Sequence, residues 1–399
     1  MSKLAGTGTA GKTAVLACGA AMIVTMEFLP IGLLSLFAVD FSIIPERAGL
    51  LIAVFALSAG TVGPVLTLLI NRWTAAGALA FCMWVFSAAS IVAALWPDFG
   101  VMLLVRVIQG ALLTPFIAVA SAAVAATAAT GQGGKAIGQI NLGTLAGIVI
   151  GVPLAVALTD LLGWHVVFLG VGILTAGVAA LIPHTLRNAC APSGDPQSYF
   201  RRQVLILRRK PLLLHLAMSG FLFTAMFAAY SYLGVYLEHV VGLTTQGISL
   251  ALFGFGLAGL AGNWLIAQVV DQHVIAPTLV TTLVLVVATG ALAFLGGHKG
   301  AALALLIPWG AAHAAAFLAC QVRVMSVAQD APAFAAALNI AIANLGIVMG
   351  AILGGFVIRH TGLDAIGIGV AVPGFLVLAI GVCLSRITNA NKHVAKRFR

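Results

Sequence analysis

The sequence predicts an all-α integral membrane protein, with twelve transmembrane helices arranged as two pseudo-symmetric six-helix bundles. Three observations lead to this fold. The 399 residues are 62% hydrophobic and 8% charged, with a mean hydropathy of +1.14. The apolar residues form long continuous runs, unlike the alternating strands of a membrane barrel. The fifth and eleventh runs also carry the same glycine pattern, as expected for a duplicated unit.

The composition excludes most classes of soluble protein. A soluble domain contains about 45–50% apolar and about 25% charged residues. A globule of this size cannot bury the apolar side chains present here, because more than half of any folded exterior faces solvent. The expected partners are therefore the lipid bilayer and a small molecule. The net charge of +10 does not indicate a nucleic-acid partner, since the basic residues lie mainly in loops between spans.

A helix needs about 20 mostly apolar residues to cross a membrane. On this basis the sequence predicts spans at 14–37, 48–70, 75–95, 100–124, 136–159, 165–183, 211–237, 247–270, 274–296, 300–324, 334–358 and 364–386. The longest polar stretch, residues 184–210, separates six spans from six. We therefore expect an N-terminal bundle at 1–190, a cytoplasmic linker at 191–210 and a C-terminal bundle at 211–399.

The distribution of Lys and Arg predicts the orientation. With a cytoplasmic N-terminus, sixteen of these residues, Arg323 among them, lie in cytoplasmic segments. Only Arg47, Lys299 and Arg359 lie on the other side, and Arg106 lies within a span. Cytoplasmic loops carry the excess of positive charge. An even number of spans then places both termini in the cytoplasm.

The fifth and eleventh spans each contain an asparagine followed by three glycines spaced four residues apart. These residues are Asn141, Gly143, Gly147 and Gly151, and, 203 positions later, Asn344, Gly346, Gly350 and Gly354. Glycines at this spacing let two helix backbones approach closely. Pro153, and likewise Pro30, Pro115 and Pro308, predict bent or broken helices of the kind expected around a substrate cavity.

Glu27 is the one carboxylate well inside a predicted span. A charge at that depth is costly, so it needs a partner, a proton or a water-filled cavity. Burial favours the neutral form of a carboxyl group, which suits a site that binds and releases protons. The alternative is a structural ion pair or a side chain that reaches to the membrane surface.

Arg106 is the matching cation. Glu27 lies about 20 Å from the start of its span and Arg106 about 9 Å from the opposite side, so both reach a similar depth in a core of about 30 Å. An arginine cannot give up its proton, so it favours the ionised carboxylate when close and ceases to do so when distant. The alternative is that Arg106 only braces neighbouring backbone carbonyls.

The seventh span carries an aromatic face, with Phe223, Phe227 and Tyr230 at helical spacing and Tyr232 beyond. Such a face suits an amphiphilic ligand, although helix packing explains it equally well. The other intramembrane polar residues include Gln109, Asn141, Gln321, Asn339, Asn344 and His313. Motifs for ATP, metals and nucleophilic catalysis are absent from the sequence, which leaves the proton gradient as the energy source and predicts no other cofactor.

These motifs resemble those of the major facilitator superfamily, in particular its bacterial twelve-helix drug:proton antiporters and the sugar-efflux branch. The run from Glu27 to Leu34 is similar to the first helix of that branch. Arg106, Gln109 and Gly110 match its fourth-helix motif, in which the arginine is implicated in proton coupling. The glycines before Pro153 resemble the fifth-helix antiporter motif, and the run 337–355 resembles the eleventh helix. Asn71 stands where the family has aspartate, beside Arg72, in a loop regarded as a conformational latch.

The resemblance implies a monomeric transporter of the bacterial inner membrane, not an enzyme, that exports a small molecule in exchange for protons by alternating access. We expect Glu27 and Arg106 to couple the proton. The expected substrate-binding residues are Phe116, Phe223, Phe227, Tyr230, Tyr232, Asn141, Asn339, Asn344 and His313. The expected conformational and packing residues are Asn71, Arg72, Gln109, Gly110, Gly143, Gly147, Gly151, Pro153, Gly346, Gly350 and Gly354.

Two other functions fit the same residues. One is a proton-independent facilitator of sugars or metabolites, in which Glu27 and Arg106 only support the structure. The other is a membrane receptor that transports nothing. The substrate also stays open between amphiphilic drugs, such as amphenicol-like antibiotics, and sugars. The scarcity of charge and the aromatic seventh span favour the drugs.

Overall fold

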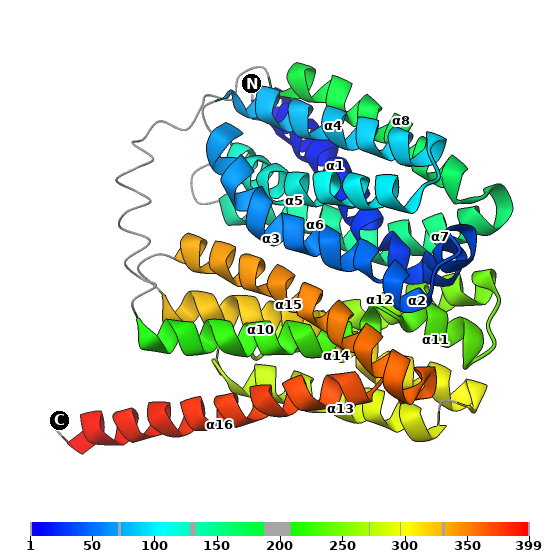
Figure 1. Ribbon diagram of the computed structural model, residues 1–399. Coiled ribbons are helices and arrows are strands. Elements are labelled where there is room, and N and C mark those ends of the chain that lie inside the picture. Colours follow the sequence, from blue (N-terminus) through cyan, green and yellow to red (C-terminus); the bar gives the residue numbers. More distant parts are fainter. Residues whose placement is uncertain are drawn as a thin grey trace. The chain divides into compact units, whose positions relative to one another are not determined.

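The computed structural model describes residues 2–70, 73–127, 133–186, 209–270, 272–295, 297–328 and 332–397. These residues form helices and connecting turns, with no strand among them (Figure 1). Twelve helical segments in this part of the chain are long and apolar enough to cross a membrane. The predicted all-α membrane fold with twelve spans is confirmed. The predicted fifth span, 136–159, lies within the helical residues 133–162.

The chain divides into two compact units. Unit 1 comprises Met1–Gly194 and Leu243–Phe253, and unit 2 comprises Asp195–Gly242 and Gly254–Arg399. The predicted linker at 191–210 lies almost entirely outside the described residues, so the predicted bundle boundaries stay predictions.

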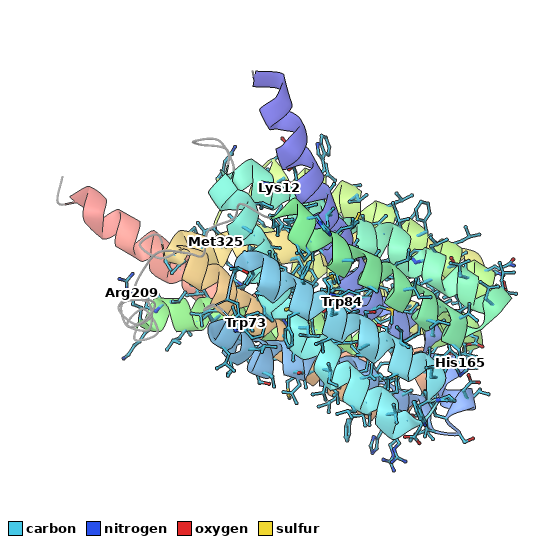
Figure 2. All side chains as sticks on the ribbon, turned by 90° about the horizontal axis from the view of Figure 1, so that it is seen from above. Lys12, Trp73, Trp84, His165, Arg209 and Met325 are labelled. Atoms are coloured by element: carbon cyan, nitrogen blue, oxygen red, sulfur yellow. The ribbon has the colours of Figure 1, made fainter. Side chains whose placement is uncertain are left out.

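Unit 1 is built from helices that pack in pairs. Its elements are α1 (Ser2–Asp40), α2 (Pro45–Ala48), α3 (Leu50–Ile70), α4 (Ala75–Leu95), α5 (Phe99–Thr127), α6 (Gly133–Ala146), the π-helix η1 (Gly147–Gly151), α7 (Val152–Leu162) and α8 (Trp164–Thr185). The main pairs are α3 with α5 and α4 with α8, while α1 packs along α6, η1 and α7. Trp73 and Trp84 are about half exposed on the outside of this unit, as expected for a surface in lipid (Figure 2).

Unit 2 repeats this construction. Its elements are α10 (Lys210–Tyr230), α11 (Leu233–His239), α12 (Thr245–Ala267, of which the part to Phe253 belongs to unit 1), α13 (Ala276–Leu295), α14 (Lys299–Val327), α15 (Pro332–Thr361), the 3-10 turn η3 (Leu363–Ala365) and α16 (Ile368–Arg397). The closest packing is between α10 and α15, and α13 and α16 each contact α10 as well.

The two glycine ladders pack in the same register. In unit 1, Cβ atoms at the three glycines would meet Ala17, Ala21 and Thr25 of α1. In unit 2, Cβ atoms at the corresponding glycines would meet Gly220, Thr224 and Ala228 of α10. Each ladder glycine thus faces a residue 126 positions earlier in the chain, in both units. This common register supports the duplicated unit that the 203-residue offset suggests.

At three of the four predicted proline positions the helix is not broken. Pro30, Pro115 and Pro308 lie inside continuous helices. In lipid, neighbouring side chains can satisfy the carbonyls that a proline leaves without a donor, and the helix then continues. The spans are irregular instead at η1, just before Pro153, and at the turn after Tyr230 that separates α10 from α11.

The ladder in unit 2 gives a direct test of this packing. The change Gly354→Ala places a methyl group against the backbone carbonyl of Ala228 and 3.0 Å from the ring of Tyr232. We expect it to lower the free energy of unfolding by about 1–3 kcal/mol, the usual cost of overpacking. Thermal unfolding in detergent measures this effect.

The control is Gly254→Ala, in α12, where a Cβ atom meets nothing within 4 Å. That change should leave the unfolding temperature unchanged or raise it slightly, because alanine favours a helix by about 1 kcal/mol over glycine. Equal unfolding temperatures for the two variants would contradict the ladder contact.

Candidate functional site

The predicted acidic residue lies on the buried side of α1. Glu27 is 9% exposed and is the one acidic residue among the buried polar residues that the structure describes. Within the same described part of the chain, its carboxylate forms no salt bridge. Glu27 is therefore a buried carboxyl group without a fixed counter-ion in contact.

Arg106 of α5 is fully buried and ties three helices together. Its Nε donates to the carbonyl of Leu51 in α3 at 2.9 Å. Its two terminal nitrogens donate to the carbonyls of Met26, at 2.6 Å, and Glu27, at 2.8 Å, in α1. The guanidinium also lies over the ring of Phe55, 4.3 Å from the ring centre. Such a planar fork of donors aimed at three carbonyls is a geometry that only arginine provides.

One of these hydrogen bonds explains why α1 stays helical through Pro30. A proline has no amide N–H, so the carbonyl four residues earlier loses its helical donor. For Pro30 that carbonyl belongs to Met26, which is the one that Arg106 reaches at 2.6 Å. The guanidinium therefore replaces the missing amide, one turn before the proline and beside Glu27.

The geometry matches the bracing role considered for Arg106, since its hydrogen bonds go to backbone carbonyls. The positive charge nevertheless lies close enough to interact electrostatically with the Glu27 carboxyl group. Arg106 and Glu27 are thus in contact, as expected from their similar depth, but the contact is with the backbone carbonyl of Glu27. The role of this pair in proton coupling stays a prediction.

The rest of the fourth-helix motif supports the guanidinium. The Oε1 of Gln109 lies 3.4 Å from Arg106, and its Nε2 donates to Ser90 of α4 at 3.0 Å. A Cβ atom at Gly110 would collide with the backbone carbonyl of Phe55, so glycine is required for α5 to approach α3. This close approach brings the Arg106 side chain to the carbonyl of Leu51.

The irregular fifth span packs against Ala21 and Thr25 of α1, the second of which is two residues before Glu27. Thr25 donates to the carbonyls of Ala21, at 2.8 Å, and Gly147, at 3.2 Å. A Cβ atom at Gly151 would collide with the Thr25 hydroxyl group. Since π-turns often occur at functional sites, η1 is consistent with a site along this part of α1. Asn71, Arg72 and the side chain of Asn141 lie outside what the structure describes.

In unit 2, aromatic rings from three helices surround His313 of α14. Its ring centre lies 4.5 Å from Tyr230 and 5.5 Å from Phe227, both of α10. Phe255 of α12 lies 5.7 Å from His313, and Phe317 of α14 lies 6.0 Å from it. We call these five residues the aromatic cluster. Phe223 and Trp309 extend it, through Phe317 and Phe255 respectively.

Several buried polar atoms of α14 and α15 lack a hydrogen-bond partner among the described residues. They are His313 Nδ1, Trp309 Nε1, Asn339 Oδ1 and Asn344 Oδ1. The amide nitrogen of Asn339 donates to Gln321 at 3.1 Å, and that of Asn344 donates to the carbonyl of Ile340 at 2.9 Å. Because buried polar groups are normally paired, these atoms are candidates for contact with a ligand.

Two predicted substrate-binding residues, Phe116 and Tyr232, do not belong to the aromatic cluster. Phe116 is fully buried in unit 1, where its ring would lie 2.6 Å from a Cβ atom at Gly19 of α1. The hydroxyl group of Tyr232 donates to the carbonyl of Ala351 at 2.9 Å and so links the turn after α10 to α15. Both residues contribute to helix packing in the structure.

The sequence analysis missed Phe255, Phe317 and Trp309 because they lie in other spans and no spacing rule connects them to Phe227 and Tyr230. It also placed Arg323 wrongly, as a loop charge. Arg323 is fully buried within α14, where His215 and Ser219 of α10 accept its hydrogen bonds. A basic residue near the end of a span normally extends to the surface, but these acceptors hold it inside.

The two units carry different residue types at equivalent positions of the repeat. The two ladders are 203 residues apart, and at the same offset Tyr230 in unit 2 corresponds to Glu27 in unit 1. Gly110 and Gly310 likewise face the carbonyls of Phe55 and Phe255. In unit 1 the ring of Phe55 contacts a guanidinium, whereas in unit 2 the ring of Phe255 contacts Tyr230, stacked at 5.2 Å. One unit thus contains a buried charged pair where the other contains aromatic rings.

The chain is similar to known membrane transporters in both sequence and structure. The sequence model of the Major Facilitator Superfamily matches residues 16–342. The "Inner membrane transport protein YdhP" of Escherichia coli O157:H7 is 30% identical over 345 residues, which cover 86% of this chain and 87% of that protein. A "Probable sugar efflux transporter" of Mannheimia succiniciproducens is 30% identical over 363 residues, 90% of each chain.

Solved structures share the fold at low sequence identity. A bacterial homologue of the human lysosomal transporter Spinster has a TM-score of 0.73 at 16% identity, covering 94% of this chain and 95% of its own. The nucleoside transporter NupG has a TM-score of 0.73 at 11% identity, covering 94% of this chain and 98% of its own. At this identity the likeness concerns the fold alone.

The geometry of Arg106 predicts that its shape is required as well as its charge. The change Arg106→Lys keeps the charge, but a single ammonium group cannot reach three carbonyls on two helices. We expect the free energy of unfolding to fall by about 3 kcal/mol, since each hydrogen bond to a charged group contributes about 1.5–3 kcal/mol. Thermal unfolding of the purified protein measures the change.

Arg47→Lys is the matched control, because Arg47 is an exposed residue of the same unit. That variant should unfold at the temperature of the parent protein. If Arg106→Lys also unfolds at the parent temperature, the three carbonyl contacts do not hold α1, α3 and α5 together.

Proposed function

Because the chain belongs to the Major Facilitator Superfamily, a family of membrane transporters and not of enzymes, we propose that it is a secondary active transporter that exports a small molecule in exchange for protons. Its relatives include an inner membrane transport protein and a probable sugar efflux transporter, which supports export across a bacterial inner membrane. The charge distribution supports cytoplasmic termini. We propose that the transporter acts as a monomer by alternating access.

The observation that carries this proposal is a buried carboxyl group beside a buried guanidinium. Glu27 has no salt bridge within the described residues, so a proton can leave or join its carboxylate without breaking an ion pair. The guanidinium of Arg106 donates to the backbone carbonyl of Glu27, so a positive charge lies next to this residue. No cofactor takes part in this proposal, in which the proton is the coupling ion.

The proposed cycle uses the two states of Glu27 in turn. Facing the cytoplasm, Glu27 is ionised and the substrate binds. After the two bundles rock to the outward-facing state, a proton reaches Glu27 from outside and the substrate leaves. For one proton per neutral substrate, the membrane potential also drives export, by about 2.3 kcal/mol per charge for each 100 mV.

We propose that the substrate binds against the aromatic cluster of unit 2. Flat aromatic rings stack on an apolar face of a ligand, and the unpaired oxygens of Asn339 and Asn344 can accept hydrogen bonds from its hydroxyl groups. An amphiphilic molecule with one apolar face and a few hydroxyl groups fits this combination. Amphenicol-like antibiotics and sugar-like metabolites both meet this description.

The first experiment tests proton coupling. Purified protein is placed in liposomes that contain a pH-sensitive dye, and a panel of sugars and antibiotics is added. We expect one class of compound to trigger proton movement, and Glu27→Gln to abolish it, because the amide cannot carry the proton.

The control is Glu46→Gln, which changes a carboxylate in α2, the short helix that follows the C-terminal end of α1. This variant should behave like the parent protein. Substrate flux that continues in Glu27→Gln, and that an uncoupler does not affect, would identify a proton-independent facilitator instead. Absence of flux for every compound with the parent protein would favour a receptor.

The second experiment tests the aromatic cluster. The change Phe227→Ala removes a ring that lies 5.6 Å from Tyr230 and 5.5 Å from His313. We expect the KM for transport to rise about tenfold, because one aromatic contact contributes about 0.5–1.5 kcal/mol beyond burial. Phe294→Ala in α13 is the control, since Phe294 is 88% exposed. An equal KM in both variants would show that the substrate does not bind at the aromatic cluster.

A further inference from the structure

Unit 2 contains a second buried guanidinium, at the end where α10 begins and α14 ends. Arg323 donates through NH1 to the carbonyl of His215 at 2.9 Å. The same nitrogen lies 3.1 Å from Nδ1 of the His215 ring. Its NH2 donates to the hydroxyl group of Ser219 at 2.8 Å and contacts the sulfur of Cys320 at 3.5 Å. Figure 2 shows Arg209, just before α10, and Met325, near the end of α14, at this end of the unit.

Among the described residues, no carboxylate forms an ion pair with this guanidinium. The sequences of α10, α13, α14, α15 and α16 contain neither aspartate nor glutamate. Leu212, Leu216 and Val324 form an apolar cluster next to the guanidinium. The described acceptors of Arg323 are all neutral, and a buried charge depends on the hydrogen bonds that it makes, so each acceptor is important for holding α10 to α14.

The contact at 3.1 Å determines the protonation state of His215. An arginine has donors and no acceptor, so Nδ1 of His215 must be the acceptor. The imidazole is therefore neutral, with its proton on Nε2. When a histidine is protonated, both ring nitrogens become donors. A proton on His215 would replace this hydrogen bond by two cations facing each other, in a site that is 6% exposed.

We infer that His215 and Arg323 form a proton-responsive joint in unit 2, which holds α10 to α14 while His215 is neutral and releases them when His215 binds a proton. The contribution of the joint is present at neutral pH and is lost as the pH falls through the titration of His215. Because α10 also carries Phe227 and Tyr230, release of its first turns changes the support of the helix that bears the aromatic cluster. The inference rests on unit 2 alone and does not require Glu27 to carry a proton.

The other titratable groups on the surrounding helices do not oppose this assignment. On α14 they are Arg323 itself, Cys320 and, ten or more residues earlier in the helix, His313 and Lys299, and α13 has none. Those of α15, Arg359 and His360, lie at its far end. On α16, Cys383 and Arg386 are exposed, and Lys210 of α10 is exposed as well. Of the described side chains, only Arg323 forms a polar contact with the His215 ring.

Hydrogen exchange measured by mass spectrometry tests the joint in the full-length protein. The variant His215→Asn keeps an acceptor, because the Oδ1 of asparagine lies as many bonds from the backbone as Nδ1, but it cannot bind a proton. Between about pH 8 and about pH 5, where histidine titrates, we compare exchange of the first turns of α10 and the last turns of α14. At the lower pH the wild-type protein should exchange about tenfold faster than His215→Asn, the scale of one lost charged hydrogen bond. At the higher pH the two should exchange alike.

Two further measurements keep the test decisive. The control variant is His360→Asn, which replaces an exposed histidine of α15 whose Nδ1 lies 2.8 Å from a backbone carbonyl. It should behave like the wild-type protein at both pH values.

If His215→Asn does not fold, the ratio of exchange in α10 to exchange in α4 within wild-type protein provides the same comparison, because the intrinsic pH effect cancels. A ratio independent of pH, or equal exchange in wild type and His215→Asn at low pH, would overturn the inference. Glu27→Gln should leave this pH response intact, which separates it from the proposed coupling.

Discussion

The hydrogen bond from Arg106 to the carbonyl of Met26 is the interaction on which the arrangement of unit 1 depends. Pro30 leaves that carbonyl without an amide donor, and the membrane offers no water to replace it. The guanidinium supplies the donor and, with its other nitrogens, fixes α3 and a second carbonyl of α1. Its positive charge is therefore held beside Glu27 by the backbone itself, whatever the protonation state of the carboxyl group.

The two units solve the same packing problem and differ in the chemistry that they bury. Both place three glycines against a neighbouring helix in one register, and a Cβ atom at any of these glycines would collide with that helix. Unit 1 then carries Glu27, and unit 2 carries Tyr230, at equivalent positions. In the proposed mechanism, Glu27 in unit 1 is the place for a proton and the aromatic cluster in unit 2 is the place for an amphiphilic substrate.

Each unit also contains one fully buried arginine that uses neutral acceptors in place of a salt bridge. In unit 1 the acceptors are carbonyls, and they include one freed by a proline. In unit 2 one acceptor is an imidazole nitrogen, which a proton can remove. The contacts of Arg106 are therefore insensitive to pH, whereas the contact of Arg323 with His215 is sensitive to pH.

The sequence by itself determined the twelve spans, the internal repeat, and Glu27 and Arg106 as unusual residues. These are local properties, because each span satisfies its own backbone hydrogen bonds in lipid and a charge in an apolar run stands out at once. Only the tertiary structure decided that Arg106 reaches Met26, that Phe255 and Phe317 join Tyr230 around His313, and that Arg323 is buried against His215. Such contacts depend on which helix faces meet, and separate helices carry no shared periodicity that would reveal it.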